Sequence, residues 1–265
     1  MKHTIKHFIG HWRAALAGLF SIGLGLFLPA TALAESNVLK ILSLGDSITQ
    51  AEINRASYRY PLWKKLIDAD IKFDFVGSMD TQQDKYSKGT PPQPNYKGRT
   101  FDKDHEGHFS WEASDIIIGR NPNNGTGSGN LAQWVQNYDF DIALVHLGTN
   151  DIFRNQSNAQ ITGELKDVII ALRRDNPRAI ILLATMIPSS KSERIEKGVE
   201  SMNEVIPGIA KEMNTADSPV IIVDQFSGFN LETDSYDGIH PNAFGEEKMA
   251  QRWFDAIQAA TRGSR

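Results

Sequence analysis

Three short segments, far apart in the sequence, contain polar residues that could together perform acyl transfer through a serine nucleophile. The first is Gly45-Asp46-Ser47, which directly follows an apolar run. A serine on a turn after a strand exposes its hydroxyl, but this group is a weak nucleophile until a base removes its proton. Gly-Asp-Ser is also ordinary turn composition. The segment therefore indicates a nucleophile only if the chain also supplies a base and an anion-stabilising group.

The segment Asp237-Gly238-Ile239-His240-Pro241 could supply the base. An aspartate three residues before a histidine can hydrogen-bond imidazole Nδ1. This bond fixes the tautomer and leaves Nε2 free to face a serine hydroxyl. We therefore predict that His240 is a general base oriented by Asp237. The alternative is a solvated loop histidine without a catalytic partner.

A third segment, Leu147-Gly148-Thr149-Asn150-Asp151, could stabilise negative charge. An asparagine amide donates well to the oxyanion that forms when a carbonyl is attacked. An Asx-turn or a helix cap is the alternative role for Asn150. Because Asn150 and Ser47 both follow apolar runs, and parallel strands end at one edge of a sheet, we expect the segments to converge.

The elements that must position these segments alternate between apolar strands and amphipathic helices. We predict strands over residues 39–44, 73–76, 142–147, 180–184 and 220–223. We predict helices over residues 60–69, 111–118, 131–138, 159–174, 193–213 and 244–261. This alternation is typical of an α/β domain with a parallel sheet covered on both faces. We expect the turn-rich segments 78–105 and 121–130 to lie towards the carboxyl edge of the sheet, where they are either functional loops or surface insertions without a role.

The composition excludes several classes of protein. The 265 residues are 40% hydrophobic and 23% charged, which excludes an intrinsically disordered chain. The lack of cysteine excludes disulfides, thiolate metal sites and a cysteine nucleophile. A formal net charge of −4 argues against a nucleic-acid-binding surface, which would need a basic face.

The first 34 residues are typical of a secretory signal peptide. Three cations precede an uncharged apolar run over residues 14–28, and Ala32-Leu33-Ala34 supplies the small residues of a cleavage site. An uncleaved membrane anchor is the alternative, but the small residues and the preceding Pro29 favour cleavage. We therefore predict export to the periplasm or the medium, no stable membrane association, and one domain over residues 35–265.

Taken in order, G-D-S at residues 45–47, G-T-N-D at 148–151 and D-x-x-H at 237–240 resemble the motifs of the SGNH hydrolases, also called GDSL esterases. The resemblance extends from about residue 41 to the last predicted helix. It implies a flavodoxin-like three-layer α/β/α fold with about five parallel strands. In this family Ser47 would be the nucleophile, His240 the general base and Asp237 its orienting partner.

The resemblance also implies an oxyanion hole made by the Asn150 amide, the Ser47 N–H and one more backbone N–H. The segment H-E-G-H-F-S-W at residues 105–111 is similar to the H-E-G-H-x-G-W segment of exported acetylxylan esterases. Ser110 occupies the position of the donor glycine. Its N–H can serve if the backbone dihedral angles are reachable, and Gly107 is the fallback donor.

Two further stretches, residues 58–63 and 73–78, look like the corresponding segments of carbohydrate esterase family 3. The resemblance implies an esterase that removes small acyl groups, chiefly acetyl, from plant polysaccharides or oligosaccharides. Asp46, beside the nucleophile, and Trp111 and Tyr58, whose faces suit sugar rings, are candidate substrate-binding residues. Core packing would account for the aromatic residues equally well.

Two other functions stay open. A lipase, lysophospholipase or thioesterase would use the same scaffold with an apolar groove. A carbohydrate-binding protein could keep the fold and lose turnover. We expect a monomer whose partner is an acylated carbohydrate and which binds no nucleic acid.

The remaining histidines have alternative roles. His105 and His108, with Asp102 and Asp104 nearby, could ligate zinc or calcium. No H-E-x-x-H spacing is present, and the family resemblance explains the segment without metal, so we predict no metal and no cofactor. His146 lies inside an apolar run and is expected to be a core histidine with satisfied hydrogen bonds.

Overall fold

Five strands of the sheet are those that the apolar runs predict. The computed structural model describes residues 38–121 and 125–262, so the predicted signal peptide lies outside the described residues. The strands run parallel in the order β2-β1-β4-β5-β6. They are β1 (Leu39–Gly45), β2 (Phe73–Val76), β4 (Ile142–His146), β5 (Ile180–Ala184) and β6 (Val220–Val223). A two-residue strand that the pattern does not predict, β3 (Glu106–Gly107), pairs with the end of β1.

The central strands are buried on both faces, which explains their continuous apolar sequence. Every residue of β4 is buried, as are the last five residues of β1. The register places Gly45 opposite both His146 of β4 and Gly107 of β3. The carboxyl ends of these three strands therefore meet at one edge of the sheet.

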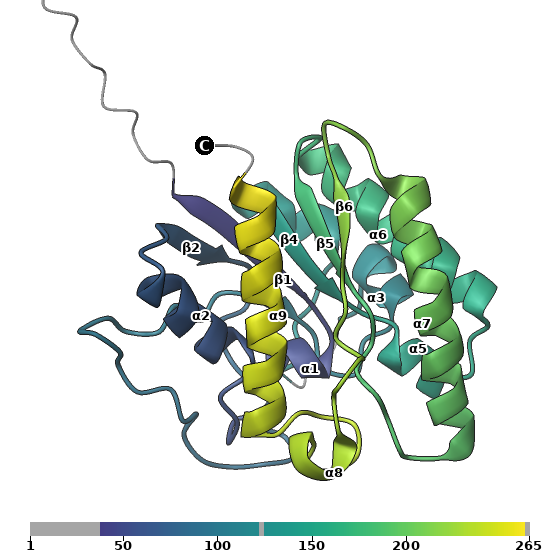
Figure 1. Cartoon of the computed structure of the whole chain (residues 1–265), viewed down its shortest axis with the longest axis horizontal. Coiled ribbons are helices and arrows are strands. Elements are labelled where there is room, and N and C mark those ends of the chain that lie inside the picture. Colours follow the sequence, from purple (N-terminus) through teal and green to yellow (C-terminus); the bar gives the residue numbers. More distant parts are fainter. Residues whose placement is uncertain (1–37, 122–124, 263–265) are drawn as a thin grey trace, which may run out of the picture. The chain divides into compact units, whose positions relative to one another are not determined.

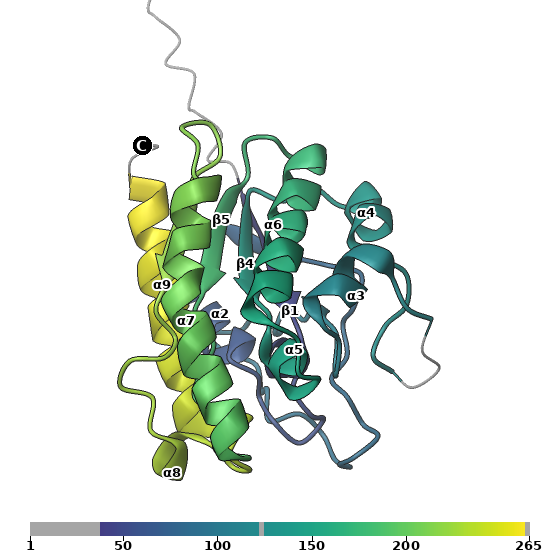
Figure 2. The same cartoon turned by 90° about the vertical axis from the view of Figure 1, so that its right-hand side faces the viewer.

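Helices cover both faces of the sheet (Figure 1). On one face, α2 (Arg59–Asp68) and α9 (Ala243–Arg262) pack against the sheet through a cluster that includes Leu62 and Trp253. On the other face, α3 (Ala113–Ile118), α6 (Asn158–Asp175) and α7 (Glu193–Met213) pack through a cluster that includes Leu165 and Met202 (Figure 2). The fold is therefore the predicted three-layer α/β/α arrangement. The helices are α1 (Ser47–Gln50), α2 (Arg59–Asp68), α3 (Ala113–Ile118), α4 (Leu131–Trp134), α5 (Thr149–Phe153), α6 (Asn158–Asp175), α7 (Glu193–Met213), α8 (Leu231–Asp234) and α9 (Ala243–Arg262), with a 3₁₀ turn at Val135–Asn137.

Both turn-rich segments reach the carboxyl edge of the sheet, as predicted. Gln50, at the end of α1, donates from Nε2 to the carbonyl oxygens of Thr81 (3.3 Å) and Gly125 (2.8 Å). One side chain thereby joins both segments to the helix that follows β1. Within the ranges 38–121 and 125–262, no helix has the length and apolar character needed to cross a bilayer.

Candidate active site

Ser47 lies on a tight turn where β1 runs into α1. A Cβ on Gly45 would come within 2.2 Å of Thr49 Oγ1 and 2.7 Å of the carbonyl oxygen of His146. Glycine therefore allows the turn to approach β4 this closely. Asp46 caps α1 with its side chain, so that Ser47 becomes the first residue of the helix. Ser47 retains 6% of its surface exposed at the sheet edge.

His240 reaches Ser47 from the loop between α8 and α9, 193 residues further along the chain. His240 Nε2 lies 2.9 Å from Ser47 Oγ, and His240 Nδ1 lies 2.9 Å from Asp237 Oδ2. Asp237 Oδ1 accepts from the backbone N–H groups of Ile239 (3.0 Å) and His240 (2.8 Å). Gly238, between these residues, has a φ of +81°, a conformation that favours glycine. The structure thus joins Ser47, His240 and Asp237 in one hydrogen-bonded chain.

Hydrogen bonds keep the Asp237 carboxylate ionised. Burial alone would raise the pKa of Asp237, but its bonds with the His240 side chain and backbone, and with Ile239, lower this pKa well below its usual value. A carboxylate can only accept a hydrogen bond, so Nδ1 of His240 carries a proton. In the neutral imidazole, the Nε2 lone pair then faces Ser47. This is the tautomer that a general base for Ser47 needs.

Aromatic rings lie beside the His240 imidazole and restrict its rotation. Phe109 and Tyr236 are both nearly parallel to it, with ring centroids 5.9 Å and 5.7 Å away. The Arg55 guanidinium lies 3.8 Å from the centroid of Tyr236. Tyr86, which is 63% exposed, packs on Phe109 at 5.5 Å. An aromatic surface therefore continues from His240 to solvent.

Asn150 lies on the first turn of α5, close to the turn that carries Ser47. Its Nδ2 donates to the carbonyl oxygen of Trp111 at 2.9 Å and, over a longer 3.3 Å, to Asp46 Oδ2. The backbone N–H groups of Ser47 and Ser110 have no hydrogen-bond partner among the residues that the structure describes. Two backbone N–H groups, and an amide whose second hydrogen makes only the longer contact, thus lie in segments that converge on the nucleophile.

Asp46 positions other parts of the site and has no surface for a substrate. It is 0% exposed, so the prediction that it binds substrate is wrong. Its two oxygens are occupied by the N–H of Ile48 (2.9 Å) and the amide of Asn150. Burial raises the pKa of Asp46 to about 6, although the Ile48 N–H and the nearby His240 oppose this rise.

Residues 43–248 match the model of the GDSL-like Lipase/Acylhydrolase family. The matched range contains Ser47, Asn150, Asp237 and His240. The chain belongs to this family.

Relatives of this GDSL-like protein include carbohydrate esterases. A solved carbohydrate esterase family 3 protein from Talaromyces cellulolyticus is 33% identical, with a TM-score of 0.70 over 85% of this chain and 99% of that one. An acetyl esterase mutant with an acetate ion is 32% identical, with a TM-score of 0.70 over 86% of this chain and 100% of that one. A multidomain esterase of Ruminococcus flavefaciens is 27% identical over 281 residues. That match includes 98% of this chain but spans only 34% of the relative's length. Family and relatives support a carboxylic ester hydrolase.

Ser110, which the motif resemblance aligns with a donor glycine, has a glycine-like backbone conformation. Ser110 has a φ of +69°, in the left-handed region that favours glycine. The fallback donor, Gly107, lies in β3 and donates its N–H to His105 Nδ1 at 2.8 Å. A Cβ on Gly107 would also lie 2.5 Å from the backbone nitrogen of Gln50. The prediction for Gly107 is therefore wrong, because its N–H is committed and its role is close packing.

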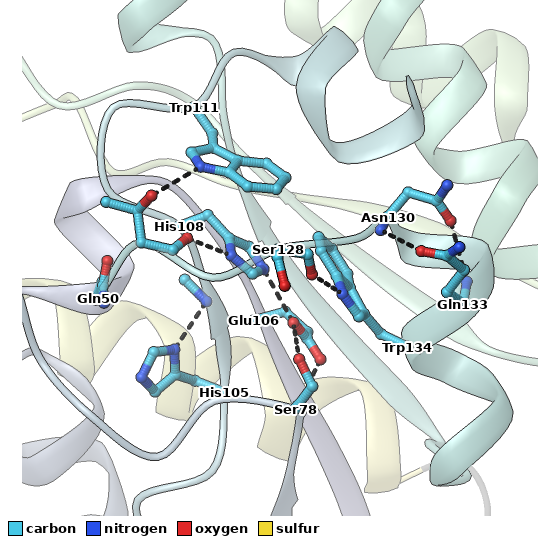
Figure 3. Close-up of polar contacts among 12 residues, drawn as sticks. Gln50, Ser78, His105, Glu106, His108, Trp111, Ser128, Asn130, Gln133 and Trp134 are labelled. Atoms are coloured by element: carbon cyan, nitrogen blue, oxygen red, sulfur yellow. Dashed lines mark hydrogen bonds and ion pairs between the residues drawn. The ribbon is translucent and has the colours of Figure 1, made fainter. Parts of the chain in front are cut away.

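Trp111 and Tyr58 are 0% exposed, so the prediction that they bind substrate is also wrong. Trp111 and Trp134 both pack on the His108 imidazole, with ring centroids 4.5 Å and 4.3 Å from it (Figure 3). The Tyr58 ring packs on Trp253 at 6.2 Å. These rings complete the core beneath the GDSL-like site and have no face free for a sugar.

A buried polar network anchors β3 and the segment that follows it (Figure 3). Glu106 Oε2 accepts from Ser78 Oγ at 3.0 Å and lies 2.9 Å from His108 Nε2. Glu106 Oε1 accepts from the Tyr138 hydroxyl at 2.6 Å. His108 Nδ1 lies 2.9 Å from the carbonyl oxygen of Thr126. Both ring nitrogens of His108 are therefore committed to protein acceptors, which assigns this histidine a structural role.

His105 and His146 are also buried, in different surroundings. His105 Nδ1 accepts from Gly107, and its Nε2 lies 3.2 Å from the carbonyl oxygen of Thr81, so both nitrogens have partners. His146 is buried as predicted, but neither ring nitrogen has a partner within the described residues. The expectation of satisfied hydrogen bonds for His146 is therefore wrong. Burial lowers the pKa of His146 to about 4, which keeps the ring neutral at neutral pH.

The sequence pattern does not reveal two polar residues that hydrogen-bond the backbone of the site. Gln50 Oε1 accepts from the N–H of Phe109 at 2.8 Å. Ser235 Oγ donates to the carbonyl oxygen of His240 at 2.8 Å. Neither residue belongs to a recognisable motif. The role of Gln50 depends on a contact between segments distant in sequence, and the role of Ser235 depends on the path of the loop that carries His240.

Proposed function

We propose that this chain is an exported serine esterase that hydrolyses small acyl esters, chiefly acetyl, on carbohydrates through an acyl-enzyme. The observation that carries the proposal is the chain from Ser47 Oγ through His240 to Asp237, with 2.9 Å at each link. This arrangement gives a serine hydroxyl a base and gives the base an orienting carboxylate. Membership of the family supports the same class of reaction.

In the first half-reaction, Ser47 Oγ attacks the ester carbonyl carbon while His240 Nε2 accepts the hydroxyl proton. The N–H groups of Ser47 and Ser110 and the Asn150 amide stabilise the tetrahedral oxyanion. When this intermediate collapses, the bond between the carbonyl carbon and the sugar oxygen breaks. The imidazolium gives its proton to that oxygen, and the acyl group stays on Ser47.

In the second half-reaction, a water molecule attacks the acyl-enzyme and His240 accepts its proton. The same donors stabilise the second oxyanion. Collapse releases the carboxylic acid product and returns the proton to Ser47 Oγ. Ionised Asp237 stabilises the imidazolium in both halves. The chain's own residues supply nucleophile, base and charge stabilisation, so we propose that no cofactor takes part.

The space beside the nucleophile favours a small acyl group. A cavity of about 10 Å³ adjoins Ser47 and His240, close to the volume that one water molecule needs. The charged residues Glu52 and Arg55 contribute to its wall. We propose that this space accepts a small acyl group such as acetyl. The similar acetyl esterase mutant with an acetate ion also supports acetyl.

The aromatic surface beside His240 favours a carbohydrate as the alcohol part of the ester. Tyr86, which is exposed, packs on the half-buried Phe109 next to the catalytic base, so the exposed aromatic surface here is chiefly that of Tyr86. Sugar rings stack on such faces through their C–H groups. The similar carbohydrate esterase family 3 structure supports this substrate class. The signal-like segment before residue 35 supports export.

Rates on two sets of esters test the proposal. We expect acetate release from acetylated xylan, and a kcat/KM for nitrophenyl acetate about tenfold or more above that for the octanoate, because longer chains overpack the small cavity. Higher rates on long-chain esters, without acetate release from the glycan, would favour a lipid-type substrate instead. Ser47→Ala should lose measurable hydrolysis, whereas Ser201→Ala, an exposed serine on α7, should leave it unchanged.

A further inference from the structure

Ser110 holds a backbone conformation that its residue type disfavours. Its φ of +69° lies in the left-handed region, where a Cβ crowds the neighbouring backbone. Ser110 is exposed, so burial of its side chain does not impose the conformation. The N–H of Trp111 closes the turn by donating to the carbonyl oxygen of His108 at 3.2 Å. Further contacts hold the Ser110 backbone, whose N–H serves as an oxyanion donor in the proposed function.

Two arginines bind the carbonyl oxygen of Ser110. Arg154 Nη2 donates to it at 3.1 Å, and Arg120 Nη1 donates to it at 3.2 Å. A carbonyl oxygen has two lone pairs, so it can accept both bonds. Hydrogen bonds from charged donors are stronger than neutral ones. Fixing this oxygen limits rotation about the Ser110 backbone.

Both arginines are held in turn by carboxylates at the start of α3. Arg154 pairs with Glu112, and Arg120 pairs with Asp115 Oδ2 at 3.1 Å. Glu112 and Asp115 form the capping box of this helix. Their side chains are only 15% and 21% exposed, so the two ion pairs are more sheltered than ordinary surface pairs. The arginines are therefore oriented before any substrate binds.

Arg154 also connects Ser110 to the side-chain donor of the site. It directly follows α5, and its N–H donates to the carbonyl oxygen of Asn150 at 2.9 Å. The Asn150 amide in turn donates to the carbonyl oxygen of Trp111, the residue after Ser110. One short helix thus carries the asparagine donor and ends at the cation that fixes the backbone donor.

We propose that Arg154 and Arg120 are positioning residues that hold Ser110 in the left-handed conformation so that its N–H completes the oxyanion hole. The arginine pair would replace the conformational freedom that a glycine has at this position. This inference rests on the proposed function, because it assigns the Ser110 N–H a part in the same reaction.

A double-mutant cycle on the Ser110→Gly background tests the inference. With Ser110 present, we expect Arg154→Ala to lower kcat on nitrophenyl acetate about tenfold or more, with KM changed less than about twofold. On the Ser110→Gly background, Arg154→Ala should lower kcat less than about threefold, because glycine reaches this conformation without strain. Affinity for a boronic acid, which forms a tetrahedral anion on the serine, should fall in parallel with kcat.

Arg194→Ala is the matched control. Arg194 also binds carbonyl oxygens of α5, on Ile152 (2.9 Å) and Phe153 (3.2 Å), but not that of Ser110. Replacing Arg194 should change kcat by the same factor with Ser110 present and on the Ser110→Gly background. If Arg154→Ala does not fold, as judged by thermal unfolding, Arg120→Ala takes its place in the cycle. An equal loss of kcat for Arg154→Ala on the two backgrounds would overturn this inference but not the proposed function. Hydrolysis by Ser47→Ala would overturn the proposed function.

Discussion

The Asn150 amide is fixed before the reaction starts. The amide donates one of its hydrogens to the carbonyl oxygen of Trp111, with 2.9 Å between Nδ2 and that oxygen. A preoriented donor needs no reorganisation when negative charge develops, which is why such groups contribute strongly to catalysis. The second hydrogen makes the longer contact of 3.3 Å with Asp46, and in the proposed mechanism it is the one available to the oxyanion.

Replacing this amide should therefore affect turnover more than binding. We expect Asn150→Ala to lower kcat by about 10²–10³, with a much smaller change in KM, because the donor acts mainly on the transition state. Steady-state hydrolysis of nitrophenyl acetate measures both constants. Asn158→Ala, which removes a partly exposed amide at the start of α6, should leave them unchanged. A kcat for Asn150→Ala within threefold of the wild type would contradict the assignment.

Residue type and spacing were enough to predict which side chains meet, but not which of their neighbours face the substrate. Ser47, Asn150 and His240 belong to motifs whose chemistry is recognisable in sequence. Trp111 and Tyr58 belong to the segments 105–111 and 58–63, which also carry the family resemblance, yet both side chains are buried in the core. Proximity along the chain does not determine the direction of a side chain, so a substrate role could not be inferred from it.

At the scale of elements, α9 brings a buried carboxyl group against the α1–α2 connection. Glu246, in the first turn of α9, is 3% exposed and accepts from the N–H of Ser57 at 2.9 Å. Burial raises the pKa of Glu246 from 4.5 to about 7, although the Ser57 bond and the cations Arg55 and Arg59 oppose this rise. The folded chain therefore binds more protons than the unfolded chain between these two pH values.

Because the folded-state pKa is the higher one, ionisation of Glu246 destabilises the fold as pH rises from 4.5 to 7. We expect Glu246→Gln to remove this pH-dependent destabilisation, since glutamine stays neutral and can still accept a hydrogen bond from the N–H of Ser57. Between pH 4.5 and 7.5, the wild type should lose on the order of 3 kcal/mol more unfolding free energy than the variant. Denaturant unfolding at several pH values measures the difference.

Glu247→Gln is the control for this prediction, because Glu247 is the next residue of α9 and its side chain is 53% exposed. It should follow the wild-type pH dependence. Asp46, another buried carboxyl group beside the site, titrates in both proteins, so its contribution cancels from the comparison. Parallel stability curves for the wild type and Glu246→Gln would contradict the role given to Glu246.

Strands with an apolar run and long amphipathic helices could be predicted, whereas elements without a visible pattern could not. The 21 residues of α7 repeat the helical period often enough to define both ends, and the prediction for 193–213 is confirmed. By contrast, α5 has five residues and β3 has two, too few for any periodicity to be visible. Both form because neighbouring strands and caps fix their backbones. The arrangement of Arg154 around Ser110 was not predictable for the same reason.

At the scale of the whole described unit, the site exists because one sheet gathers segments from both ends of the chain. Ser47 and His240 are 193 residues apart, yet their side chains are 2.9 Å apart. The parallel order β2-β1-β4-β5-β6 puts every strand's carboxyl end at the same edge, so the loops after β1, β4 and β6 contribute to one site. The alternation of strands and helices predicted this convergence, while the distances required the structure.

Covalent labelling by a fluorophosphonate tests most directly whether this convergence creates a reactive serine. The reagent is attacked only by an activated hydroxyl, and intact mass with peptide mapping locates the adduct. We predict a single adduct on Ser47 in the wild type, no adduct in Ser47→Ala, and strongly slowed labelling in His240→Ala. An adduct on another residue, or labelling of His240→Ala at the wild-type rate, would contradict the account.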